Sequence, residues 1–597
     1  MAAFNILTKD GADDLYAPQR YTPPISIKSV PAVLDSSWGY QHAAYTQDNV
    51  VTLNDGTQFW IGINASKKAV ISKRNVDLGT DWSTPFDLST IPGDPFQPLV
   101  ADSHNTFAIG VDINGRVIAA GNMHENPLRC AYTTNPNDLT AWTTIAPTDG
   151  TQDQCTYVSF FTAKNGTLYR YWRDGAATQG NVFYDRWNPV TLAFENQVTF
   201  MNGVVSGEGP YPWRVAISRA GKWGVAFCWR GEAGADTNND LCYVETSDNG
   251  ATWRRADGSV QPLPITHANA QIILPAKTGW GLLNQGGCDF DINERINIGV
   301  QLYDTNGKTQ IHNVHWTGTA FANDKLTNLD ETVVQAGQTT LDLVTARPQV
   351  VCTDAGRTLV ITRSRGNGYG NRPICIDATP GAGNNTFPIL DMDLEEWEPA
   401  IDSRALRSRN VLTMFVGSIL SPANSRRSWE RQWGGILTIA LDKIDELATK
   451  RAKLPTIQTL RTYYVGPEVT LTKTADANEI TFGVPQISRQ QMGPGAKFFM
   501  RWSARMALVS PTANGTYYFN EQPDPGATTE NTYKVGEVYF QAGMYAGVAT
   551  PWVPLVGTPY RIDGIDRDTR LIMRGAANNA AGIKFGAWTV EIGVLDA

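Results

Sequence analysis

The chain lacks the long apolar runs that a membrane helix needs. No stretch of its 597 residues approaches the roughly 18 consecutive apolar residues of such a helix. The first 16 residues, MAAFNILTKDGADDLY, contain neither the basic segment nor the apolar core of a secretory signal. We therefore expect a soluble folded protein that does not insert into a membrane and has no visible secretory signal.

Cysteine and positive charge are also in short supply. The seven cysteines are scattered without CxxC spacing, and their odd number argues against a complete disulfide framework, so we expect buried thiols. The net charge of -8 gives no general reason to bind nucleic acid. An anionic partner would have to be bound by a local basic site. The length favours several domains, or one repeat architecture with an appendage.

Residues 40–440 repeat one theme, in which an alternating apolar strand is followed by a Gly or Asn turn and further strands. Seven such units can be counted, for example those that open with HNTFAIGVDINGRVIAAG and YVSFFTAKNGTLYRYW. A recurrence every roughly 50 to 75 residues with almost no helical periodicity is typical of a β-propeller built from four-stranded blades. The sequence predicts a seven-bladed β-propeller over 40–440, preceded by an N-terminal extension over 1–39.

One unit contains the Asp-box pattern TSDNGATW at residues 246–253. In this pattern Asp248 and a turn at Gly250 hold a hairpin between the outer strands, and Trp253 packs between blades. The pattern is specific for propellers of the sialidase-like or BNR type, but its role is structural.

The pattern changes after residue 440. LDKIDELATKRAKL has helical apolar spacing, which predicts a helical connector over 441–462. Residues 463–597 return to β alternation and contain no His or Cys, so we expect a separate β-sandwich or jelly-roll domain. Without imidazole or thiol, this domain suits oligomerisation or binding better than acid–base chemistry.

The chemically able residues lie at the open ends of two neighbouring hairpins. If Asn114 is the centre of the first hairpin, with Gly115 left-handed, His104 lies directly opposite His124. The same construction centred on Asn165 puts Tyr157 opposite Arg173. Opposed residues have Cβ atoms about 5 Å apart, so each hairpin would present a two-residue cluster. A lone Tyr–Arg pair is a common structural pair, and the paired histidines favour the functional interpretation.

Two more hairpins place polar residues at matching positions. One puts Tyr211 opposite Trp229, with Arg230 adjacent. The other puts Arg347 opposite Arg363, two cations that need an anion between them or an internal Asp partner. Together these residues would line the mouth of a propeller funnel and suit an acidic glycan.

Other site chemistries are less well supported by the sequence. Asp102, His104, His124 and Glu125 could ligate zinc, but they lack a diagnostic spacing, and we predict neither a metal nor a cofactor. No Ser lies in a Gly-x-Ser-x-Gly turn near these residues, which argues against a nucleophilic triad.

The stretches DSHNTFAIGVDINGRVIAAGNMHENPLRCAYT, YVSFFTAKNGTLYRYWRDG, NNDLCYVETSDNGATW and LLNQGGCDFDINERINIGV resemble the BNR-4 type repeat proteins, which include seven-bladed polysaccharide lyases such as the ulvan lyases. The resemblance implies a site of two histidines from one hairpin with a Tyr and an Arg from the next. These map to His104, His124, Tyr157 and Arg173, with Tyr211 as a substrate-side tyrosine.

The C-terminal segment has no counterpart in those lyases and looks like part of a bacteriophage tail fibre or tailspike. This resemblance implies a homotrimer in a virion tail, possible contacts with other phage tail proteins, and a bacterial capsular or exopolysaccharide as the substrate.

The chemistry implied by the lyases is β-elimination next to a uronate carboxylate. Arg173 would neutralise the carboxylate, and His104 and Tyr157 would jointly supply base and acid, with His124 orienting them or sharing the role. If Tyr157 is the base, Arg173 would have to lower its pKa. The alternatives are a tail protein that binds glycan without cleaving it, and a sialidase-like hydrolase.

Overall fold

The computed structural model divides into two compact units, Met1–Arg451 and Ala452–Ala597. Each unit is described by itself below. Among the described residues, no helix is long and apolar enough to cross a membrane. The structure describes residues 25–32, 34, 43–45, 48–97, 99, 102–335, 341, 343–390, 394–417 and 434–444, and the backbone of the strands between 458 and 595.

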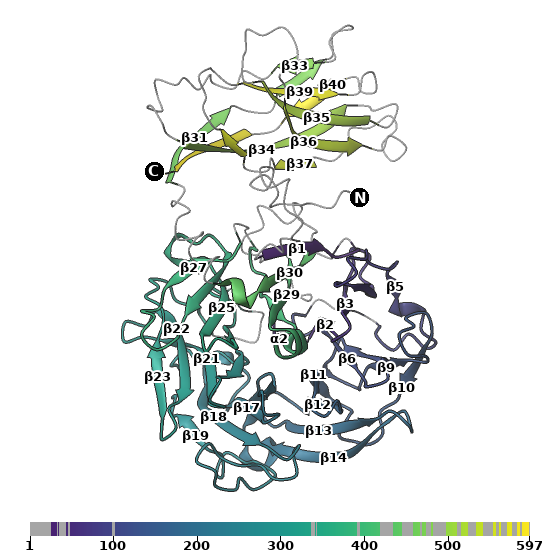
Figure 1. Cartoon of the computed structure of the whole chain (residues 1–597), viewed down its shortest axis with the longest axis vertical. Coiled ribbons are helices and arrows are strands. Elements are labelled where there is room, and N and C mark those ends of the chain that lie inside the picture. The colour runs from purple at the N-terminus through teal and green to yellow at the C-terminus, as the bar shows by residue number, and fades with distance from the viewer. Residues whose placement is uncertain are drawn as a thin grey trace. The chain divides into compact units, whose positions relative to one another are not determined.

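The first unit is a seven-bladed β-propeller, as predicted, with its blades arranged in a ring (Figure 1). Blade one contains β2 (Val50–Thr52), β3 (Thr57–Ile63), β4 (Ala69–Asn75) and β5 (Phe86–Asp87). Blade two contains β6 (Phe107–Val111), β7 (Val117–Gly121), β9 (Cys130–Thr133) and β10 (Trp142–Ile145). Blade three contains β11 (Cys155–Thr162), β12 (Leu168–Asp174), β13 (Asn181–Asn188) and β14 (Ala193–Asn202), with β8 (His124–Asn126) added at its inner edge.

The remaining blades follow in chain order. Blade four contains β15 (Gly209–Pro212), β16 (Ala216–Ile217), β17 (Trp223–Arg230), β18 (Asn238–Thr246) and β19 (Ile272–Leu274). Blade five contains β20 (Cys288–Phe290), β21 (Ile296–Tyr303), β22 (Thr309–Trp316) and β23 (Phe321–Lys325). Blade six contains β24 (Gln349–Cys352), β25 (Thr358–Ser364), β26 (Arg372–Asp377) and β27 (Thr386–Pro388). Blade seven contains β28 (Ala400–Ile401), β29 (Val411–Gly417) and β30 (Gly434–Ala440). The helical segments are η1 (Leu88–Thr90), α1 (Gly203–Ser206), η2 (Ala235–Thr237), η3 (Gly366–Gly368), α2 (Ser403–Arg409) and η5 (Leu441–Lys443).

The burial of the strands follows from the packing of blades face to face. Every residue of the inner strands β6 and β7 is buried, because neighbouring blades cover both faces of these strands. The outer strand β10 has two exposed residues. All seven cysteines are free and buried, which confirms the expectation of buried thiols.

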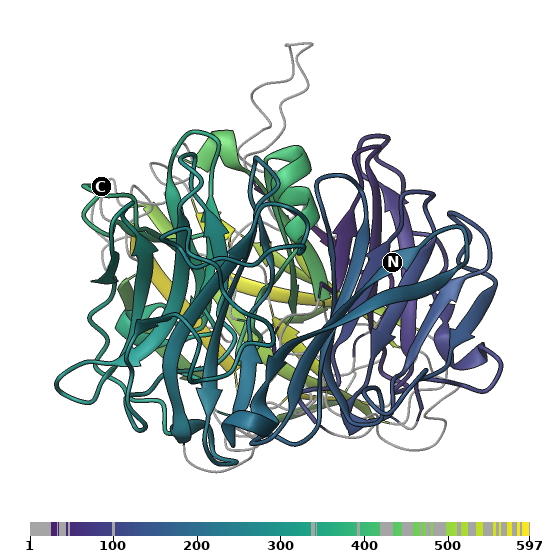
Figure 2. The same cartoon turned by 90° about the horizontal axis from the view of Figure 1, so that it is seen from below.

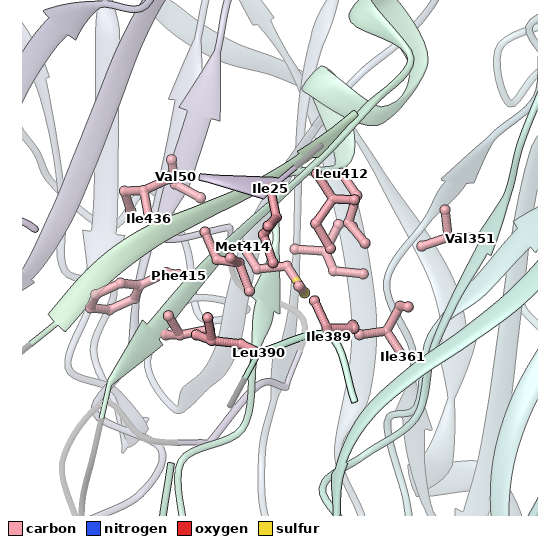
Figure 3. Close-up of a cluster of buried hydrophobic side chains, with 14 of the residues drawn as sticks. Ile25, Val50, Val351, Ile361, Ile389, Leu390, Leu412, Met414, Phe415 and Ile436 are labelled. Carbon is pink, nitrogen blue, oxygen red and sulfur yellow. The ribbon is translucent and has the colours of Figure 1, made fainter. Parts of the chain in front are cut away.

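An N-terminal strand completes blade seven and closes the ring. β1 (Ile25–Ser29) pairs antiparallel with β30, so the propeller includes part of the segment that we assigned to an extension over 1–39. Ile25 lies in one buried cluster with Val50 of blade one and Met414 of blade seven (Figure 3). The first and last parts of the propeller are therefore held together by the hydrogen bonds between β1 and β30 and by apolar packing.

The Asp-box behaves as predicted. Oδ1 of Asp248 accepts hydrogen bonds from the Thr246 hydroxyl (2.7 Å) and from the Thr252 amide (2.8 Å), and Gly250 has φ of 85°. Trp253 is buried, and its ring centroid lies 4.5 Å from that of Phe200 in blade three. The box therefore contributes to packing between blades three and four.

Helix α2 lies inside the ring (Figure 1) and contacts the far ends of several inner strands. Arg404 donates to the carbonyl of Val111 at 3.2 Å, and Arg407 pairs with Asp289. Because α2 follows the inner strand β28, it lies where the inner strands end. Seen from the second direction, the strands of the blades run between the two ends of the ring (Figure 2).

Asp402, the N-cap of α2, makes the stability of the propeller dependent on pH. Burial, with the nearby Asp48 carboxylate, raises the pKa of Asp402 to about 7, and its Oδ1 accepts from the Ala405 amide at 2.9 Å. The folded state therefore keeps a proton that the unfolded chain loses near pH 4, and stability falls as pH rises from about 4 to 7.

Asp402→Asn is expected to raise the free energy of unfolding at pH 8 by up to about 4 kcal/mol, at 1.36 kcal/mol per pKa unit. Asn keeps the cap and stays neutral, so little change is expected at pH 4. Thermal unfolding of both proteins at the two pH values tests this, with the exposed Asp442→Asn as control. An equal effect at both pH values would contradict the assignment.

The backbone of the second unit forms two antiparallel sheets. One contains β31 (Gln458–Val465), β32 (Val469–Thr472), β34 (Lys497–Val509), β37 (Val553–Val556), β38 (Tyr560–Ile562), β40 (Gly582–Phe585) and β41 (Trp588–Leu595). The other contains β33 (Glu479–Thr481), β35 (Gly515–Gln522), β36 (Tyr533–Phe540) and β39 (Arg570–Gly575). For this second unit, the sandwich or jelly-roll topology and the role in oligomerisation stay predictions. Of the predicted connector over 441–462, the structure describes η5, Ile444 and the start of β31, and the rest lies outside the described residues.

Candidate active site

A polar pocket of about 250 Å³ lies where the inner strands of the blades begin. Every blade contributes to it through the segment that leads into its inner strand or through that strand's first residues. The contributing residues, from blade one to blade seven, are Tyr45, His104, Tyr157, Tyr211, Asn284, Arg347 and Glu398, joined by Ser103, His124, Glu125 and Arg230. The pocket therefore lies at one mouth of the ring, and α2 occupies the opposite end.

A single carboxylate connects the two histidines. Oδ1 of Asp102 lies 2.5 Å from Nδ1 of His104, and Oδ2 lies 2.6 Å from Nδ1 of His124. The two imidazole rings are stacked, with centroids 3.8 Å apart. Oδ1 of Asp102 also accepts the backbone N–H of His104 at 2.9 Å, which fixes the turn before β6.

The protonation states of this cluster follow from burial and hydrogen bonding. Burial alone would raise the pKa of Asp102, but hydrogen bonds from His104 and His124 hold it well below its usual range. Burial lowers the pKa of His104 to about 4, helped by the neighbouring His124 and Arg173 charges and opposed by Asp102. At neutral pH the cluster therefore holds an ionised carboxylate next to a neutral His104.

Tyr157 extends the hydrogen-bonded chain into the pocket. Its hydroxyl lies 3.0 Å from Nε2 of His104. Burial raises the pKa of Tyr157 well above its ordinary value, with further increases from Tyr211 and Tyr45, and Arg173 lowers it only in part. Tyr157 is therefore a phenol at rest, and its O–H donates to the unprotonated Nε2 of His104.

A bulge gives Tyr157 this position. The β11–β12 ladder shifts register between Thr156 and Ser159, and Tyr157 has φ of 59°. As a result Arg173 pairs with Thr156 and not with Tyr157, so the predicted register is wrong by one residue at this end of the hairpin. A β-bulge redirects a side chain in this way, and a non-glycine residue with positive φ is a form of strain that is common at functional sites.

Arg173 lies behind the two tyrosines and is 1% exposed. Its Cζ is 5.2 Å from the ring centroid of Tyr157 and 4.8 Å from that of Tyr211. Its Nε and Nη1 are buried without a hydrogen-bond partner, and it forms no ion pair with a described carboxylate. Gly180 leaves room for it, because a Cβ there would be 2.9 Å from Cγ of Arg173. Arg173 is therefore a buried cation whose described neighbours are the two tyrosines.

Arg230 lies in the pocket wall next to Tyr211. It donates to the Tyr211 hydroxyl (2.8 Å), to Oδ1 of Asn238 (2.7 Å) and to Oδ1 of Asn284 (2.8 Å). Its Cζ stands 3.9 Å from the Tyr211 ring centroid. Tyr211 pairs with Cys228, not with Trp229, so this predicted pair is also wrong by one residue. The break between β15 and β16 causes the shift, because the ladder is centred on Ala220 only through β16.

The two remaining predicted arginines are separated by the fold. The β24–β25 ladder is centred on Ala355 as predicted, but it begins at Gln349, so Arg347 and Arg363 are not a ladder pair. Arg347 lines the pocket and pairs with Glu398 at 2.5 Å. Arg363 is fully buried, is not among the pocket residues, and donates to the Leu343 carbonyl at 2.8 Å. The structure therefore does not bring Arg363 to the pocket with the other predicted residues.

His104 and His124 lie side by side, but they are not the directly opposed hairpin pair that the sequence predicted. The β6–β7 ladder is centred on Asn114, and Gly115 has φ of 86°, both as predicted. The ladder ends at Phe107 and Gly121, and the chain then turns through left-handed Asn122 so that His124 pairs with β11. The rings meet through Asp102 and stacking.

Several pocket residues were not predicted. Tyr45 stacks on His104 (centroids 5.1 Å apart), hydrogen-bonds to Ser103 and carries Arg347 on its ring at 4.5 Å. The short spacing of Asp102 and His104 was a usable signal for an Asp–His pair, because an Asx turn brings such residues together. Tyr45 and Glu398 carry no such local signal.

The carboxylate and imidazole groups are of the kinds that bind metal ions. One donor atom each from Asp102, His104 and His124 lie within 4.8 Å of one another. The Nδ1–O distances of 2.5 and 2.6 Å are shorter than the roughly 3.3 Å between ligands of a tetrahedral zinc ion. These groups therefore fit a hydrogen-bonded cluster better than a zinc site.

Comparison with known proteins agrees with the fold. Residues 40–329 match the model of a BNR repeat-containing family. Among solved structures, the chain is similar to a polysaccharide lyase described as an ulvan lyase, with 15% identity and a TM-score of 0.51 over 69% of this chain and 96% of that chain. The same kind of lyase bound to -[GlcA(1-4)Rha3S]- gives 15% identity and a TM-score of 0.52 over the same shares.

A less similar solved structure, an α-L-arabinanase from Penicillium chrysogenum, has 10% identity and a TM-score of 0.35 over 56% of this chain and 93% of that chain. No curated protein matches the sequence. At 15% identity, the likeness to the two lyase structures shows the fold alone.

Proposed function

We propose that this protein is a polysaccharide lyase that cleaves an acidic, uronate-containing bacterial glycan by β-elimination. The observation that carries the proposal is a neutral imidazole–phenol pair, His104 and Tyr157, beside the buried guanidinium of Arg173, which forms no ion pair with a described carboxylate. Acid–base groups next to a cation that no internal carboxylate neutralises suit a substrate with a carboxylate at the reacting carbon. The match to BNR repeat proteins and the fold shared with a polysaccharide lyase support it.

In this reaction a base removes the C5 proton of the uronate, and an enolate develops on the carboxylate. The C4–O bond then breaks, the leaving oxygen takes a proton, and a C4–C5 double bond remains in the new terminal sugar. Arg173 and Arg230 supply the positive charge that stabilises the enolate. Arg230 is held by three hydrogen bonds and keeps two of its five N–H groups for a carboxylate.

The protonation states of Tyr157 and the two histidines determine which group acts as the acid and which as the base. Tyr157 is a phenol and can donate to the leaving oxygen, because its pKa is raised. His104 and His124 are the groups that can accept the C5 proton. His124 lines the pocket, and no described residue bonds to its Nε2. After each turnover the histidine that took the C5 proton releases it to solvent, and Tyr157, having given its proton to the leaving oxygen, takes one back from solvent.

The proposal is tested by incubating the protein with capsular and exopolysaccharides and following the ultraviolet absorbance of an unsaturated uronate. We expect kcat/KM to fall as the pH is lowered toward about 4, where His104 gains a proton and its Nε2 can no longer accept the Tyr157 hydroxyl. Cleavage without new absorbance would favour a hydrolase. Binding without cleavage would favour a receptor-binding protein.

The setting of this activity is part of the proposal. A virion tail, a homotrimer and contacts with other tail proteins are expectations that rest on the character of residues 463–597, whose side chains lie outside the described part of the chain.

A further inference from the structure

The hydrogen bonds of Asp102 define the tautomers of both histidines. An ionised carboxylate can only accept hydrogen bonds, so the Nδ1 atoms of His104 and His124 each carry the proton that lies between them and Asp102. In the neutral rings Nε2 is then unprotonated. The stacking of the rings at 3.8 Å disfavours two positive charges side by side.

The two unprotonated nitrogens face different partners. Nε2 of His104 accepts the hydroxyl of Tyr157 at 3.0 Å. Nε2 of His124 has no partner among the described residues, and its side chain is 36% exposed in the pocket wall. One carboxylate thus prepares two acceptors, one directed at the phenol and one open to a ligand.

We propose that Asp102 is a positioning residue that holds His104 and His124 as Nδ1-protonated tautomers and so directs both Nε2 atoms to proton transfer. The catalytic role of Asp102 rests on the proposed lyase function. The tautomers themselves are a property of the free protein and can be measured without substrate.

The geometry separates this role from a purely structural one. Oδ1 of Asp102 accepts two bonds from His104, from its backbone N–H and its Nδ1–H, whereas Oδ2 accepts only from His124. In Asp102→Asn, the amide oxygen can keep both bonds to His104, and the turn is preserved. The amide NH₂ then faces Nδ1 of His124, which must become an acceptor, so His124 alone should change to the Nε2-protonated tautomer.

The experiment uses the full chain with ¹⁵N-labelled histidine, which gives only six side chains to assign. We expect the Nδ1 and Nε2 signals of His124 to exchange their protonated and unprotonated positions in Asp102→Asn, while those of His104 stay. Cleavage should fall about 10²–10⁴-fold, and the thermal midpoint should change little, since a wrong tautomer removes a catalytic nitrogen without removing a contact. His124→Gln assigns the signals.

Asp324→Asn is the matched control. Oδ2 of Asp324, on the outer strand β23 of blade five, lies 3.5 Å from Nδ1 of His315 on the neighbouring strand β22. Among the six histidines the substitution should affect only the signals of His315 and its neighbour His312, and it should leave cleavage unchanged. Unchanged His124 signals in Asp102→Asn, or full cleavage with the changed tautomer, would overturn the proposal. One equivalent of zinc that shifts both histidines in the wild type would overturn it in favour of a metal site. If the wild type forms no unsaturated product, the lyase function fails while the tautomer result is still read independently.

Discussion

Tyr157→Phe and His104→Ala are expected to remove nearly all glycan cleavage while leaving glycan binding almost unchanged. The Tyr157 hydroxyl and Nε2 of His104 are 3.0 Å apart and act by moving protons, which matters in the transition state and little in the bound ground state. A general acid or base contributes about 10² to 10⁴ in rate, so each variant should lose at least that much.

The Tyr157→Phe variant is the cleaner of the two because it removes only a hydroxyl. His104→Ala also removes a ring that stacks on Tyr45 and His124, so its thermal midpoint must be measured alongside its kinetics. Tyr184→Phe is the control, since the Tyr184 hydroxyl bonds to the carbonyl of Gly250, away from the pocket. Full cleavage by both active-site variants would rule out the proposed roles.

Arg173→Ala is expected to weaken both binding and turnover. Arg173 does not line the pocket but lies directly behind Tyr157 and Tyr211, so its charge would act on the substrate carboxylate across these two rings, in the ground state and more strongly as the enolate forms. Binding should lose at most a few kcal/mol, and turnover should lose roughly another 10² to 10³. Loss of Arg173 also removes an interaction that lowers the pKa of Tyr157, so the phenol becomes harder to ionise.

The folded state should survive this change better than the loss of a paired arginine. Arg173 has no ion pair with a described carboxylate, so its removal leaves no buried anion uncompensated. Arg347→Ala, by contrast, would leave the buried Glu398 unpaired and should destabilise the protein. Arg186→Ala, on an exposed position of β13 in the same blade, controls for the lost charge. Kinetics and isothermal titration measure the effects, and an Arg173→Ala protein with unchanged kcat/KM would contradict the role.

The centres of the hairpins could be predicted from the sequence, but their register near the pocket could not. Turn chemistry determined the centres of the hairpins at Asn114, Asn165 and Ala355, because a left-handed glycine after a polar loop has few alternatives. The register failed beyond the regular ladder, at the bulge of Tyr157 and at the break before β16. A bulge depends on packing against neighbouring strands, which no local pattern encodes.

Ion-pair and hydrogen-bond partners from distant parts of the chain could not be predicted from the sequence either. The internal partner of Arg347 is Glu398, 51 residues away, where the sequence suggested an Asp or a shared anion. Asp102 was considered only as a metal ligand, yet its carboxylate joins both histidines. Closure of the ring by β1 was also missed, because a short N-terminal strand shows no repeat of its own.

By itself the sequence determined the number of blades, the buried state of the cysteines, the Asp-box packing and which rare residues lie near one mouth. These depend on periodicity, turn residues and hydrophobic pattern, which act over a few neighbouring residues. Only the tertiary structure decided which nitrogen of each histidine carries a proton, which arginines have a carboxylate partner, and that Tyr157 bonds to His104. Those outcomes depend on burial and on contacts between segments that lead into different blades, and such contacts exist only once the ring has closed.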